Sequence, residues 1–188
     1  MGKENKRAIT TKQLTLTALL LAICIVSQFF KNASVYITGP VINTALILAA
    51  VYCGGMCAVI LSIITPVTAF FITGAPIMAM VPLMFPCIML GNIVLVDCVL
   101  FLKKRLCIGG VPVGGMIIGS VLKGAFMGGV ISMLLLPMVM PSLPEKMQAM
   151  LPMLQLQFSL TQLITALIGS AVAAIIMKLP IAAIRDAE

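Results

Sequence analysis

Two ionisable side chains, Asp97 and Lys123, interrupt long apolar stretches of this 188-residue sequence. A charge inside a bilayer is costly, so such residues commonly face a cavity or a partner and suggest a functional site. Lys123 follows Pro112 by eleven residues, which is about 16 Å along a helix and near the bilayer centre. Lys123 therefore either contacts a ligand or has a structural, snorkelling role. For Asp97, five residues before Leu102, the structural interpretation is favoured.

Neutral polar side chains form a second set of candidates. Amides in lipid need hydrogen-bond partners, so most should point inward, where they either join helices or line a pocket. These candidates are Gln28, Asn43, Asn92 and Gln162. They fall in the outer and central parts of the expected helices, as in a pocket that opens outward. Gln155 lies seven residues before Gln162, so this pair should share one helix face.

The composition leaves few residues for catalysis or metal binding. The sequence has no His and only five acidic residues, and the spacing of its six Cys matches metal ligands only loosely. No Walker A motif is present, so the chain itself should not hydrolyse ATP. We therefore expect no enzymatic activity, no metal site and no cofactor.

The composition also indicates which solvent surrounds the protein. Hydrophobic residues make up 62% of the chain and charged residues 9%, against roughly 45–50% and 25% in soluble domains. Six helices of about 20 residues fit this length as one membrane domain. Pro82 and Pro86 should kink or break the outer part of the fourth span. The expected spans are 14–30, 41–53, 56–71, 77–102, 113–136 and 153–178, after a basic tail at 1–13.

The distribution of cations predicts the orientation of these spans. Nine of the twelve Lys and Arg residues fall on one face of the six-span arrangement, and cytoplasmic loops are enriched in Lys and Arg. Both termini are therefore predicted to be cytoplasmic, with the loops at 31–40, 72–76 and 141–152 outside. Topology explains the net charge of +7, so no nucleic-acid partner is expected. The nine residues are Lys3, Lys6, Arg7, Lys12, Lys103, Lys104, Arg105, Lys178 and Arg185.

Small residues recur at four-residue spacing, which lets helices approach closely. Contact within one subunit is the default interpretation of such pairs. Ala18 and Ala22, in the cytoplasmic half of the first helix, could instead contact another membrane subunit. The other sets are Gly115 with Gly119, Gly124 with Gly128, and Ala166 with Ser170 and Ala174.

With six predicted helices, both ends inside and its motifs in this order along the chain, the sequence resembles the S components of bacterial energy-coupling factor (ECF) transporters. The resemblance covers about residues 10–180. It depends on the Ala-x3-Ala pair of the first helix and on three runs: ITGPVIN at 37–43, IMLGN at 88–92 and TQLITALIG at 161–169. The family's fold implies six helices that capture a vitamin or similar micronutrient outside the bacterial plasma membrane. It also implies three partners, a transmembrane coupling subunit and two ATPases, which drive release inside.

The same resemblance assigns roles to individual residues. Asn92 and Lys123 match positions that face the ligand, and Ala18 and Ala22 match the contact with the coupling subunit. The stretch 31–40 corresponds to a lid over the pocket, so Tyr36 is included among the expected ligand contacts. The chain departs from members that stack flat rings, because it has no Trp and only 5% aromatic residues. No particular vitamin is therefore assigned, although a central Lys123 favours a carboxylate or carbonyl-rich ligand.

Other functions stay open at this point. A self-contained carrier or channel would transport alone and could use Asp97 and Lys123 as ion-coupled gates, although no internal repeat supports one. An assembly or scaffold subunit would use the buried polar residues for structure only. An intramembrane enzyme is least favoured, because the sequence offers no plausible catalytic base. The sequence does not decide whether Lys123 meets the ligand or Asp97.

Overall fold

The computed structural model describes residues 9–30 and 34–179, and most of these are helical. Six helices are long and apolar enough to cross a membrane. Within the described residues no strand forms, apart from one isolated bridge between Ile108 and Val111. The prediction of an all-α fold with six helices of this kind is confirmed. Four of the cations used to predict orientation lie outside the described residues: Lys3, Lys6, Arg7 and Arg185.

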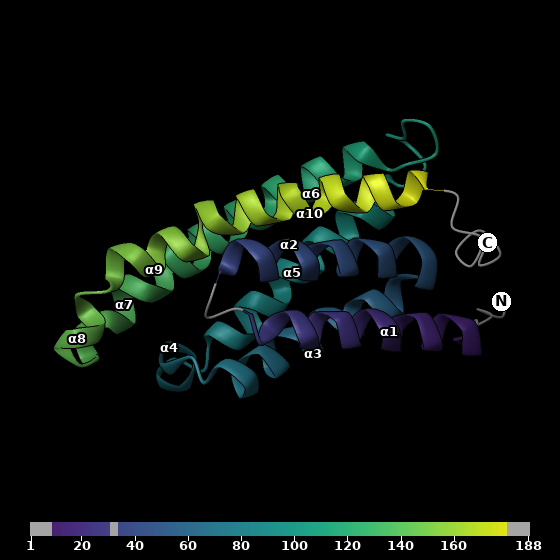
Figure 1. Ribbon diagram of the computed structural model, residues 1–188. Helices are drawn as coiled ribbons and strands as arrows, with labels where there is room; N and C mark the ends of the chain where they lie inside the picture. The colour runs from purple at the N-terminus through teal and green to yellow at the C-terminus, as the bar shows by residue number, and fades with distance from the viewer. Residues whose placement is uncertain (1–8, 31–33, 180–188) are drawn as a thin grey trace, which may run out of the picture.

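The helical segments follow one another with few long connections (Figure 1). Several are continuous, since the π-helical segments η1 and η2 prolong α2 and α6. The segments are α1 Thr11–Gln28, α2 Val35–Leu48, η1 Ala49–Cys53, α3 Gly55–Thr73, α4 Pro76–Met80, α5 Met84–Leu102, α6 Val113–Met127, η2 Gly128–Leu135, α7 Leu136–Val139, η3 Met140–Ser142, α8 Glu145–Gln148, α9 Leu151–Phe158 and α10 Leu160–Lys178.

Local sequence signals explain several helix ends. The Thr10 side chain accepts from the Gln13 backbone N–H and the Gln13 side chain accepts from the Thr10 N–H, which forms a capping box for α1. Ser34 caps α2 in the same way, by accepting a backbone N–H. Gly54, with φ of 90°, separates η1 from α3, and Gly74 ends α3 in the left-handed region, where glycine is favoured.

The second span is longer than predicted. It was expected over 41–53, after an outer loop at 31–40, but α2 begins at Val35. The physical reason is the Ser34 cap, together with close packing of the glycine and proline that suggested a loop. Gly39 lies against Thr165 of α10, and Pro40 is buried inside the helix. Of the expected lid stretch, residues 35–40 are therefore helical.

The spans after the third also differ from their predicted limits. Pro82 lies in the break between α4 and α5, as expected from its effect on helices. The fifth span continues beyond 136 through α7 and η3 to Ser142. The sixth begins at Leu151 and is interrupted at Ser159, where φ and ψ are −114° and −90°.

The six spans alternate in direction, so α1 begins and α10 ends at the same end of the bundle (Figure 1). We call this the basic end, and the opposite one the far end. Helix α5 packs between α3 and α6, and α10 packs against α2 and α6. At the far end, the hairpin formed by α7, α8 and α9 projects beyond the other helices (Figure 1). The described cations of the basic end are Lys12, Lys103, Lys104, Arg105 and Lys178.

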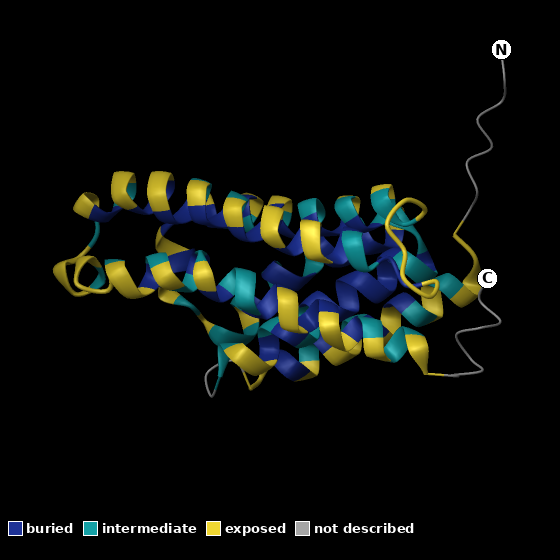
Figure 2. Cartoon of the chain, turned by 90° about the horizontal axis from the view of Figure 1, so that it is seen from above, coloured by how far each residue is buried: buried dark blue, intermediate teal, exposed yellow. Residues whose placement is uncertain are grey.

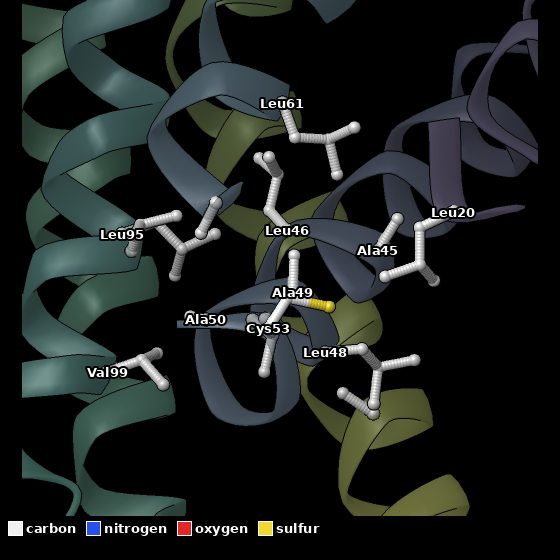
Figure 3. Packing of buried hydrophobic residues seen from close by; sticks show 14 of the residues in the cluster. Leu20, Ala45, Leu46, Leu48, Ala49, Ala50, Cys53, Leu61, Leu95 and Val99 are labelled. Atoms are coloured by element: carbon white, nitrogen blue, oxygen red, sulfur yellow. The ribbon is translucent and has the colours of Figure 1, made fainter. Parts of the chain in front are cut away.

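Two separate hydrophobic clusters fill the bundle, and buried residues follow the inward faces of the helices (Figure 2). The first cluster lies toward the basic end, where Leu20 of α1 and Leu95 and Val99 of α5 lie around the segment that joins α2 to η1 (Figure 3). The second lies toward the far end and includes Met84 of α5 and Met127 of α6. Buried polar residues lie on several of the helices, and Asn43, Asn92 and Lys123 are among them.

Candidate functional site

Three polar residues from different helices lie at the same depth in the bundle. They are Asn43 of α2, Asn92 of α5 and Lys123 of α6. Each is ten residues along its span from the basic end of the bundle. At 1.5 Å per residue this depth is about 15 Å, near the middle of a hydrocarbon core of about 30 Å. Helical rise alone therefore brings the three side chains to one level.

The three side chains form one hydrogen-bonded group, which we call the Lys–Asn node. Lys123 Nζ donates to Asn43 Oδ1 over 2.6 Å and to Asn92 Oδ1 over 2.7 Å. The Lys123 side chain is only 2% exposed. Asn92 Nδ2 in turn donates to the Ser62 carbonyl of α3 at 3.4 Å. The node therefore connects four helices through the amides of α2 and α5.

Asp97 is not a partner of Lys123. Its side chain is exposed on the outer surface of α5, and no ion pair joins Lys123 to a carboxylate in the part of the chain that the structure describes. The question left by the sequence is thus answered for these two residues: Lys123 meets neutral amides, and Asp97 lies elsewhere.

Small residues bring the helices of the node close together. A Cβ on Gly169 of α10 would lie 2.7 Å from the Asn43 Cβ and 2.8 Å from the Pro40 carbonyl oxygen. Beside it, the Thr44 hydroxyl donates to the Gly169 carbonyl at 3.0 Å. Gly119 gives the same close approach of α6 to α5. These small residues serve packing within the subunit, whereas Ala18 and Ala22 are exposed on α1.

A cavity of about 110 Å³ lies against the node. Each residue that lines it lies at the depth of the node or closer to the far end, so the node forms the floor of the cavity. Its polar lining is Thr38, Asn43, Thr65, Asn92, Lys123, Gln157 and Gln162. Its other lining residues are Val35, Gly39, Ile42, Pro66, Ala69, Met78, Ile88 and Phe158.

Thr65 is a lining residue that sequence reasoning missed. It is 1% exposed, and its hydroxyl has no hydrogen-bond partner in the described structure. Buried polar groups are normally paired, so an unpaired hydroxyl in a cavity wall calls for an explanation such as a ligand or a bound water. The only sequence signal at this position is a threonine directly before Pro66, and threonine also occurs in helices without a ligand.

Not all predicted site residues reach the cavity. Asn43, Asn92, Lys123 and Gln162 line it. Gln28 is buried but does not, because its Nε2 donates to the Thr65 carbonyl at 3.0 Å and so joins α1 to α3. Tyr36 does not line it either, since α2 turns this side chain outward and leaves it 53% exposed.

Gln155 and Gln162 were expected to share one helix face, but they lie in different helices, α9 and α10. The interruption at Ser159 changes the direction of the side chains on either side of it. Gln155 exchanges two hydrogen bonds with Ser132, each of 2.9 Å, whereas Gln162 faces the cavity. Gln157, which was not predicted, joins Gln162 in the lining.

The polar lining of the cavity can donate and accept hydrogen bonds. The described lining contains one cation, amides and hydroxyls, and none of its residues is a carboxylate, cysteine or histidine. No group of three or more potential metal ligands occurs among the described residues. Comparison with protein-family models, with curated proteins and with solved structures finds no match for this chain.

Proposed function

We propose that this protein is the membrane-embedded substrate-binding subunit of an ATP-driven importer for a vitamin or similar micronutrient. One observation carries the proposal: a buried lysine, held by two neutral amides, forms the floor of a cavity between helices. A scaffold protein has no need of an intramembrane cation beside a cavity, because such a charge is costly to bury. Ligand pockets combine apolar walls with a few convergent polar groups, as this cavity does.

The orientation is part of the proposal. We place the basic end and both termini in the cytoplasm of a bacterial cell, because cytoplasmic loops are enriched in Lys and Arg. The far end then faces outward, and the cavity lies on the outer side of its polar floor. This is the side from which an importer must capture its substrate.

The energy source is assigned to partner subunits. The pair Ala18 and Ala22 is exposed on α1, where small residues permit close contact with a helix of another membrane protein. We propose that a transmembrane coupling subunit docks there and transmits the action of two ATPases. This assignment follows the resemblance to ECF S components that the sequence carries.

The first test is chemical identification of the cargo. The chain is purified in mild detergent from cells grown in rich medium, and any retained small molecule is identified by mass spectrometry. A stoichiometric micronutrient that Lys123→Met releases is the expected result. Absence of any retained molecule, together with no binding across a vitamin panel, would favour a scaffold role.

A second test separates a binding subunit from a self-contained carrier. Proteoliposomes that contain the chain alone should bind the identified molecule without accumulating it. Accumulation should require the coupling subunit, the ATPases and ATP. Transport by the chain alone would instead identify a carrier.

A further inference from the structure

We infer that the ligand of this cavity carries one carboxylate on an aliphatic body, with the carboxylate bound at Lys123 and the body directed toward the far end. This inference rests on the proposed function and names its substrate class. It depends on three features of the described residues: the charge of the floor, the direction of the amide donors and the nature of the walls.

An ammonium at the floor of the cavity favours an anionic ligand. Lys123 is the one cation in the described lining, and its two partners are neutral. An ammonium has three donor hydrogens, of which the two Asn oxygens accept two. Burying a charge without an opposite charge is costly, and a carboxylate offsets this cost more fully than a neutral carbonyl does. An amine at the same place would be repelled.

The amide donors also favour an acceptor-only ligand group. Lysine only donates hydrogen bonds, so both Asn residues must turn their oxygens toward Nζ. With its oxygen turned to Nζ, Asn43 keeps its Nδ2 hydrogens as donors, and the Thr65 hydroxyl is buried and unpaired. Both groups line the same cavity. A carboxylate has about four acceptor positions and no donor, so it matches a lining that offers the donors of Lys123, Asn43 and Thr65.

The walls define the body of the ligand. Apart from Phe158 the apolar lining is aliphatic or methionine, so it provides no pair of rings between which a flat aromatic system could stack. A second cavity, of about 290 Å³, lies nearer the far end and shares Val35, Met78, Gln157 and Phe158 with the first. Its further lining includes Met147 and Met150, which adapt to chains of variable shape. An aliphatic body directed past Met78 and Phe158 would meet the methionines of this second lining.

The test compares each of three carboxylic acids with its primary amide on the purified full-length protein. The pairs are octanoate with octanamide, lipoate with lipoamide, and biotin with biotinamide, and titration calorimetry in detergent gives the affinities. At least one acid should bind about 10- to 100-fold more tightly than its amide, as expected for one desolvated charge-assisted contact. Lys123→Met should remove this preference, whereas Lys146→Met, at an exposed position of the far-end helix α8, should keep it.

The outcomes separate this inference from the proposed function. If the molecule retained on purification lacks a carboxylate, or if amides bind as tightly as acids, the inference is wrong while a binding subunit remains supported. If no acid binds, the inference is also overturned, and the absence of any retained molecule would then count against the proposed function as well. The comparison of acid with amide on the unmodified protein needs no variant, so it stays decisive should Lys123→Met fail to fold.

Discussion

At the scale of single residues, the partners of Lys123 determine what the site can bind. A carboxylate partner would neutralise the ammonium inside the protein and leave little charge for a ligand. Asn43 and Asn92 instead position Nζ through neutral oxygens, at 2.6 and 2.7 Å, without cancelling its charge. The node therefore fixes the position of Nζ without supplying a counter-ion, which suits a binding site for an anion better than a purely structural contact.

Removing one member of the node should destabilise the protein more than removing all three. Asn43→Leu or Asn92→Leu leaves Lys123 buried with one lost acceptor, and each should lower the free energy of unfolding by about 1–3 kcal/mol. Thermal unfolding in detergent without ligand measures the effect. The triple variant with Lys123→Met should recover most of the loss, since the Lys123 ammonium and the amides that paired with it are then removed together. Additive losses in the triple variant would show that the three residues do not act as a unit.

At the scale of helices, the site depends on how closely α2, α6 and α10 approach one another. Gly169 places the backbone of α10 directly against Asn43 and Pro40. The hydroxyl oxygens of Ser120 of α6 and Ser170 of α10 are 3.0 Å apart and form a hydrogen bond. These contacts hold the helix that carries Asn43 near the helix that carries Lys123. The geometry of the node is thus a consequence of small residues outside the cavity.

Gly169→Ala should disrupt this contact. The added Cβ would lie 2.7 Å from the Asn43 Cβ and 2.8 Å from a backbone oxygen, so α2 and α10 must move apart. We expect a loss of about 1–3 kcal/mol in stability and a parallel loss of ligand affinity. Gly129→Ala is the matched control, because a Cβ there meets nothing within 4 Å. Equal melting temperatures for the two variants would argue against close α2–α10 packing.

The sequence predicted the parts of the site that depend on depth, and it missed those that depend on helix rotation. Amides in apolar helices must point inward, which identified Asn43 and Asn92, and helical rise placed Lys123 at mid-depth. The direction of Tyr36 depends on the packing of α2 against its neighbours, which no local pattern specifies. Thr65 was missed because threonine is common in helices and can bond to its own backbone.

Helix limits show the same division between local and tertiary causes. Pro82 indicated the break before α5, because proline removes a backbone donor and clashes with the preceding turn. Gly39 and Pro40 suggested a loop, yet tertiary packing against α10 keeps both inside α2. The interruption at Ser159 has no proline or glycine beside it, so its local sequence did not predict it.

At the scale of the whole molecule, the node divides the bundle into a half at the basic end and a half at the far end. The half at the basic end contains the first hydrophobic cluster, and the half at the far end contains the second cluster together with the cavity that has the node as its floor. The proposed binding cavity is thereby separated in space from the α1 surface that carries Ala18 and Ala22. Under the proposed function, a partner contact on that surface can change without altering the residues that line the cavity.

Bulky residues on α1 should therefore uncouple uptake from binding. Ala18→Leu combined with Ala22→Leu adds volume at two exposed positions, so stability and ligand affinity should stay within experimental error of the unmodified protein. ATP-driven uptake in cells that contain the coupling subunit and ATPases should be abolished. Ala125→Leu, exposed on α6, is the control and should leave uptake intact. Normal uptake by the double variant would exclude this face of α1 as the docking surface.

The proposed direction of transport requires that the far end face outward, and two cysteine positions can test it. Cys107 is exposed in the loop at the basic end, while Cys24, Cys53, Cys57 and Cys87 are buried and Cys98 is half-buried within α5. In spheroplasts, a membrane-impermeant maleimide should therefore label Cys107 only after permeabilisation. In a Cys107→Ser background, Lys146→Cys should be labelled without permeabilisation, because α8 lies at the far end. The reverse labelling pattern would show that the far end, and with it the cavity, faces the cytoplasm. A subunit in that orientation could not capture external substrate.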